Sequence, residues 1–158
     1  MADAVLLTGF INQAIAQTRT LARSLYRVEL EANGLMAALD ELARNTSKMR
    51  KISCDFHCEE PILVHDHSVA THLYRIAQGG IDNAIKHDKA SAISVVLSRF
   101  DGKTVLSIRD NGTGMTEAPG DRKGMGLHIM RYRAQALGAS FTIGPGESSL
   151  RPTEAAPW

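Results

Sequence analysis

The chain has 158 residues, enough for one domain with an additional helix or tail and for a core that needs no cross-links. Eighteen basic and 17 acidic residues leave a formal net charge of +1, so charge gives no reason to expect nucleic acid or a membrane surface as a partner. Two cysteines, no apolar run near the roughly 18 residues of a membrane span and no export signal predict a reduced, cytoplasmic location.

Residues 5–27 predict one amphipathic helix. Its apolar side chains recur at helical spacing: Leu6, Phe10, Ile11, Ala14, Ile15, Leu21, Ala22 and Leu25. This stretch cannot form a core of its own, so we expect it to pack on the body of the chain or on a partner. Asn33-Gly34 then interrupts the pattern.

From residue 35 onward, helical and strand patterns alternate. Helices are predicted at 35–44, 68–87 and 125–137. Strands are predicted at 51–58, 61–64, 92–100, 104–108 and 141–143. Asp101-Gly102 is a hairpin turn signal, and Gly138 is a helix stop. This order predicts an α+β fold, a two-layer sandwich with helices on one side of a mixed, mainly antiparallel sheet.

Two glycine motifs follow predicted strands or open predicted helices. Asp110 ends a β-rich run and is followed by Gly112 and Gly114; a strand-end carboxylate can accept from an amino group of a planar ligand, which glycines allow the backbone to approach. Gly124-Met125-Gly126-Leu127 opens a helix, where backbone N–H groups can cradle phosphate. Taken singly, an ordinary turn and a ligand-free helix entry explain the two motifs as well.

The predicted helix 68–87 carries a polar strip beside its apolar stripe. Positions 79, 83 and 87 are four residues apart and therefore share a face. Asn83 offers an amide oxygen, a ligand type that Mg²⁺ accepts. The plain alternatives are a polar surface residue for Asn83 and a solvated helix end for Lys86 and His87.

In this order, the three motifs resemble the nucleotide site of the GHKL ATPase superfamily. Segments 72–78 and 83–87 are similar to the asparagine box of sensor histidine kinases of the nitrate-sensor and lipid-fluidity-sensor type, and 126–134 is similar to their second glycine box. The resemblance runs from about residue 17 to 146. It implies the Bergerat ATP-binding fold, with ATP and Mg²⁺ as ligands.

The resemblance also implies residue roles. Asn83 would bind the Mg²⁺ that bridges the ATP phosphates, and Asp110 would accept from the adenine amino group. Gly112 and Gly114 would shape the adenine pocket, and Ser149 would place a hydroxyl near the adenine. The hinge of the lid and the phosphate-binding amides would be at Gly124, Gly126 and Leu127. Lys86 and His87 would lie near the phosphates.

Three features depart from the family. Gly79 replaces the glutamate four residues before the asparagine, the general base or water-orienting group of phosphoryl transfer. None of the six histidines lies in the context of a phosphoacceptor helix, and residues 150–158 lack the character of the family's final strand. Two functions follow: an active histidine kinase domain in which another group or water compensates for Gly79, or an ATP-binding pseudokinase or regulatory module.

The resemblance divides the chain into three parts. Residues 1–32 would be a remnant of the dimerisation helix and linker, 33–150 the catalytic domain and 151–158 a tail. The parent protein, cytoplasmic or membrane-anchored, would be a homodimer that phosphorylates a histidine on its own separate helix and then a response regulator. For this chain itself, neither nucleic acid nor direct membrane contact is expected.

A metal centre is the rival interpretation of one cluster. Its candidate ligands are Cys54, His57, Cys58, His65 and His67. The cysteines lie on a predicted strand, where neighbours point to opposite faces, and their spacing is not that of a usual zinc knuckle. Core cysteines and surface histidines are therefore favoured.

Overall fold

The computed structural model describes positions 11, 14–15, 18, 34–86, 89–113, 125–144 and 147–152, the last segment by its backbone alone. The four described positions before residue 34 are helical and exposed, as expected for a helix there. The remainder of the predicted helix 5–27 lies outside the described residues.

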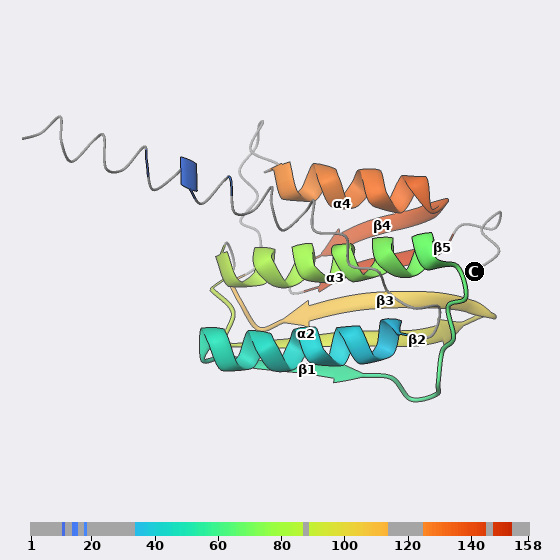
Figure 1. Cartoon of the computed structure of the whole chain (residues 1–158), viewed down its shortest axis with the longest axis horizontal. Helices are drawn as coiled ribbons and strands as arrows, with labels where there is room; N and C mark the ends of the chain where they lie inside the picture. Colours follow the sequence, from blue (N-terminus) through green and yellow to red (C-terminus); the bar gives the residue numbers. More distant parts are fainter. Residues whose placement is uncertain are drawn as a thin grey trace, which may run out of the picture.

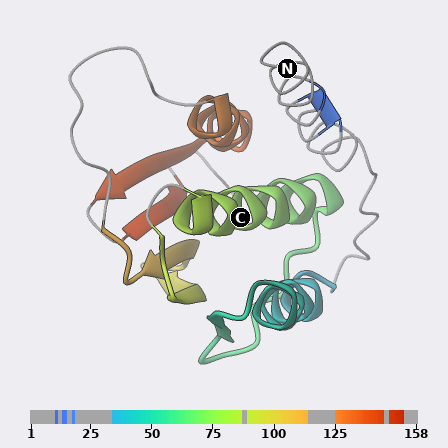
Figure 2. The same ribbon diagram turned by 90° about the vertical axis from the view of Figure 1, so that its left-hand side faces the viewer.

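Three helices cover one side of a five-stranded sheet (Figures 1 and 2). The helices are α2 (Leu35–Arg50), α3 (His67–Lys86) and α4 (Met125–Ala136). The strands are β1 (Ser53–His57), β2 (Ala92–Phe100), β3 (Lys103–Asp110), β4 (Ala139–Gly144) and β5 (Glu147–Pro152). The sheet order is β1-β2-β3-β5-β4, with β1 parallel to β2 and the other neighbours antiparallel. The predicted two-layer α+β sandwich is confirmed.

Three predicted elements differ from the structure. Helix α2 continues to Arg50 instead of ending at residue 44, and residues 61–64 form no strand. Strand β5, unexpected from the sequence, lies inside the sheet between β3 and β4. Its serines and terminal Pro152 are weak strand formers. The segment is nevertheless a strand because β3 on one side and β4 on the other pair with its backbone.

Local signals explain where the elements begin and end. The Asp66 carboxylate accepts from the backbone N–H groups of Ser68 and Val69 and so caps the start of α3. Asp101 and Gly102 both have positive φ, as a two-residue hairpin turn between β2 and β3 requires. Gly138, at φ 63°, follows the end of α4.

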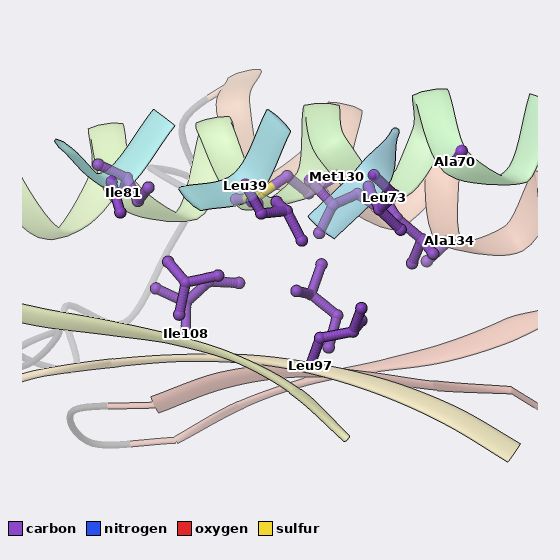
Figure 3. Packing of buried hydrophobic residues seen from close by; sticks show 14 of the residues in the cluster. Leu39, Ala70, Leu73, Ile81, Leu97, Ile108, Met130 and Ala134 are labelled. Carbon is purple, nitrogen blue, oxygen red and sulfur yellow. The ribbon is translucent and has the colours of Figure 1, made fainter. Parts of the chain in front are cut away.

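The core lies between the helical layer and the sheet. Its largest fully buried side chains are Leu35, Leu39, Leu73, Ile76, Val95, Leu97 and Leu106. Figure 3 shows side chains of all three helices facing Leu97 and Ile108 of the sheet. A Cβ on Gly80 would lie 3.1 Å from Cγ1 of Ile108, so this glycine allows α3 to approach β3 closely.

Candidate nucleotide site

The carboxyl end of β3 is held by two consecutive polar residues. Asp110 Oδ1 accepts from the Gly112 backbone N–H at 2.8 Å. Asn111 Oδ1 accepts from the N–H groups of Ser91 and Ala92 at 3.0 and 2.8 Å, and its Nδ2 donates to Ser91 Oγ at 2.9 Å. These bonds fix the Asp110 backbone, and within the described residues no hydrogen bond engages Oδ2 of its carboxylate.

The end of α3 is tied to the same corner of the molecule. The Ala90 N–H donates to the Ala84 carbonyl near the end of α3, and Ala90 directly precedes the two residues that Asn111 binds. The Asn111 N–H also donates to the Ala92 carbonyl. The final turns of α3, the start of β2 and the end of β3 therefore meet, which brings Asn83 and Asp110 to one end of the sandwich.

The first turn of α4 lies close to the Asn83 side chain. A Cβ built on Gly126 would lie 3.3 Å from Asn83 Oδ1. Because glycine has no Cβ, the amide oxygen of Asn83 has room at this position. The Asn83 side chain makes no hydrogen bond or ion pair with the rest of the described chain. Its oxygen is thus available as a ligand beside backbone N–H groups at a helix start.

Helices α3 and α4 run side by side in opposite directions from this point (Figure 1). One turn before Asn83, a Cβ on Gly79 would lie 3.0 Å from Met130 Sδ. Further along, Arg133 Nη1 lies 3.4 Å from His72 Nδ1. Burial, and secondarily the Arg133 charge, lower the pKa of His72 below its ordinary value of 6.5.

Other predicted site residues are placed as follows. Lys86 is the exposed last residue of α3, and Leu127 is half-buried against the core. His87, Gly114 and Gly124 lie outside the described residues. Ser149 pairs with Ser107, whereas its neighbour in the chain pairs with Ile108. Because strand residues alternate between faces, the register places position 149 on the sheet face opposite to Ile108, and its implied role beside adenine stays a prediction.

Two residues of the site were not predicted from the sequence. Asn111 was interpreted only as part of a turn, although its amide joins β3 to the start of β2. Met130 lies within the segment 126–134 that resembles the second glycine box, and the structure places its side chain against Gly79. The side-chain bonds of Asn111 depend on the pairing of β2 with β3, and nothing in the sequence pairs Met130 with Gly79.

The rival metal cluster does not assemble. Cys54 is buried in the core, and its burial, with the neighbouring Asp55 charge, raises the pKa of the thiol to about 11. Cys58 donates instead to the Glu60 carbonyl at 2.9 Å. Across the described residues, no three His, Cys, Asp or Glu side chains are grouped to hold a metal ion.

A separate groove of about 530 Å³ lies between α2 and α3. Gln78 and Asp82 line it from α3, and none of Asn83, Asp110 and Gly126 contributes to it. It therefore belongs to another side of α3 than the site described above.

In the part of the chain that the structure describes, no helix is long and apolar enough to cross a membrane.

A helical asparagine, a strand-end aspartate and a glycine helix entry, gathered at one end of an α+β sandwich, are suited to hold a nucleotide. The family model for "Histidine kinase-, DNA gyrase B-, and HSP90-like ATPase" matches residues 68–154, more than half of the chain. The chain belongs to this ATPase family.

Curated relatives include sensor kinases. The chain is 34% identical over 134 residues to the nitrate/nitrite sensor protein NarQ of Escherichia coli K12, covering 84% of this chain and 24% of the relative. It is 30% identical over 126 residues to the sensor histidine kinase LiaS of Bacillus subtilis, covering 80% and 34%. The chain thus spans about a quarter to a third of the length of these relatives.

Solved structures share the fold. The ATP-binding domain of PrrB from Mycobacterium tuberculosis matches with a TM-score of 0.59 and 19% identity, over 77% of this chain and 95% of that one. The histidine kinase domain of the Erythrobacter litoralis EL346 blue-light activated kinase matches with a TM-score of 0.60 and 18% identity, over 75% and 64%.

Proposed function

We propose that this chain is the ATP-binding catalytic domain of a two-component sensor histidine kinase, which transfers the γ-phosphoryl group of ATP to a histidine on a separate helical segment. The observation that carries the proposal is the contact between Asn83 and the glycine entry of α4, at the end of the sandwich that also holds Asp110. Membership of the ATPase family and kinase relatives support it.

Each residue has a chemical task in this proposal. Asp110 Oδ2 accepts from the adenine amino group, because Oδ1 is already engaged by Gly112. The amide oxygen of Asn83, which has no hydrogen-bond partner among the described residues, fits a hard cation and would hold Mg²⁺, which supplies positive charge to the phosphates when bound. The backbone N–H groups of Gly126 and Leu127 at the start of α4 donate hydrogen bonds to phosphate oxygens, and Lys86 adds a nearby positive charge.

The partner would dock beside this site. Met125, Ile129 and Tyr132 of α4 are 75%, 43% and 72% exposed, and their spacing of four and three residues places them on one face. An exposed apolar strip suits a helix, here the phosphoacceptor helix of the homodimeric parent. We further propose that the domain acts in the cytoplasm, where ATP is available, and that a response regulator receives the phosphoryl group.

Two measurements test the proposal. Calorimetry should detect binding of Mg-ADP with an affinity on the order of micromolar. Wild-type chain incubated with labelled Mg-ATP and a supplied phosphoacceptor-helix protein should transfer label to that protein. Absence of nucleotide binding would contradict the family-level function. Binding without transfer would favour the alternative, a catalytically impaired pseudokinase or regulatory module with Gly79 at the usual glutamate position.

A further inference from the structure

Helices α3 and α4 approach each other at two successive turns, and a glycine lies at each approach. A Cβ on Gly79 would lie 3.0 Å from Sδ and 3.1 Å from Cγ of Met130. A Cβ on Gly126 would lie 3.3 Å from Asn83 Oδ1. Residues 79 and 83 are one turn apart, as are 126 and 130. The contacts therefore alternate: a glycine of α3 receives a side chain of α4, and a glycine of α4 receives a side chain of α3.

We propose that Met130 is a positioning residue for the nucleotide site, because by filling the space over Gly79 it sets the separation of α3 and α4. That separation fixes how far the Asn83 amide oxygen lies from the backbone N–H groups that open α4. The inference rests on the proposed nucleotide function and adds to it the residue that holds the two halves of the site in register.

The packing around Met130 supports this role. Its side chain is 2% exposed, and one turn further along α4 Ala134 is fully buried, so both face the core (Figure 3). Its unbranched thioether can follow a narrow channel between helices. Glycine inside a helix is unfavourable relative to alanine, so its presence at position 79 is consistent with a need for close approach.

This contact gives Gly79 a second meaning. The glutamate expected at this position from the family resemblance would press on Met130 as it lies here, since even a Cβ at position 79 would require the thioether to shift by a few tenths of an ångström. The glycine is therefore more than the loss of a carboxylate. Gly79→Glu alone should therefore shift Met130 and lower nucleotide affinity.

The first experiment separates positioning from stability. Affinity for ADP is measured by calorimetry with Mg²⁺ and with a chelator, for wild type, Met130→Ala, Met130→Leu and Leu39→Ala. Leu39 is fully buried on α2, which α3 separates from α4 (Figures 1 and 2), and controls for loss of core volume. Met130→Ala should lose about tenfold in affinity, mainly in the Mg²⁺-dependent part. The volume-conserving Met130→Leu should stay within about threefold of wild type. Leu39→Ala should lower the melting temperature but not the affinity.

The second experiment is a double-mutant cycle. Gly79→Glu and Met130→Ala should each weaken Mg-ADP binding, and the double variant should bind about tenfold better than the product of the single effects predicts. Independent effects, or a Met130→Ala variant that binds like wild type or no worse than Leu39→Ala, would overturn the positioning role while the nucleotide function stands. A wild-type chain that binds no ADP would overturn the proposed function and the positioning role together.

Discussion

At the scale of single residues, Asp110 provides the sharpest test of nucleotide recognition. Its Oδ1 accepts from Gly112, so Asp110→Asn replaces one carboxylate oxygen by an amide NH₂ that cannot accept from adenine. The adenine amino group would then lack an acceptor, which should cost about 1–3 kcal/mol of binding free energy. Calorimetry with ADP measures the loss. Asp101→Asn, the same change in charge on the exposed hairpin turn, should leave the affinity unchanged; equal losses from both would contradict the adenine contact.

Gly126 tests the contact with Asn83 from the other helix. Alanine there should improve the helix propensity of α4 by about 1 kcal/mol, so the fold should not suffer. The added methyl group would nevertheless lie 3.3 Å from Asn83 Oδ1 and press on it, which requires the oxygen to shift by a few tenths of an ångström, and Mg-ADP affinity should fall by about tenfold. In Gly144→Ala an added Cβ meets nothing within 4 Å, which makes it the matched control. Unchanged Mg-ADP binding by Gly126→Ala would argue against a ligand role for Asn83.

The placement of single residues could be predicted where spacing alone defines a helix face. The helical interval of four brought Asn83 and position 79 onto one side of α3, and both indeed face α4. The partner of Gly79 could not be predicted, because Met130 is distant in the sequence and its contact depends on how two helices pack. Asn111 illustrates a different limit, since its side-chain bonds depend on β2 and β3 being neighbours.

At the scale of elements, the contact between α3 and α4 predicts a pH effect. His72 is partly buried on α3 beside Arg133 of α4, with the charge of Arg75 also near Arg133, and its pKa is lowered. The unfolded chain therefore binds a proton more readily than the folded one. Stability from neutral His72 is fully present above its ordinary pKa of 6.5 and is lost as pH falls from there toward the lowered pKa.

His72→Gln should remove this part of the pH dependence. Thermal unfolding of both proteins between about pH 7.5 and 5.5 would show a steeper loss of melting temperature on acidification for wild type. Superimposable slopes would mean that the α3–α4 contact tolerates protonated His72. Because Arg133 contributes the smaller cause, Arg133→Gln should reduce the slope only in part.

Strongly periodic elements were predictable, and β5 was not. Helices α3 and α4 and the β2–β3 hairpin agree with the sequence to within a few residues, since apolar period and turn residues carry that information locally. Strand β5 contains a serine pair and ends in proline, and only its two flanking strands make it a strand. Non-local pairing leaves no local signal in the sequence.

At the scale of the whole molecule, the apolar stripe predicted for residues 5–27 bears on self-association. Ile11 and Ile15 are helical and 55% and 44% exposed. Among the described positions of this segment, these two large apolar side chains offer far less area than the roughly 1,600 Å² that a standard stable interface buries. We therefore expect a dimer weaker than about micromolar, with the domain largely monomeric at the concentrations of most assays.

Sedimentation velocity over a wide concentration range tests this expectation. The double variant Ile11→Gln and Ile15→Gln should abolish the residual association, because the apolar contact is its source. Thr18→Gln, an exposed position on the same helical segment, should leave the association as in wild type. A nanomolar wild-type dimer would require a second apolar surface, and α4 with Met125, Ile129 and Tyr132 is the face on which to seek it. Loss of that dimer on Tyr132→Gln but not on the isoleucine changes would place self-association on the strip that we assign to the phosphoacceptor helix, and the two interactions would then compete.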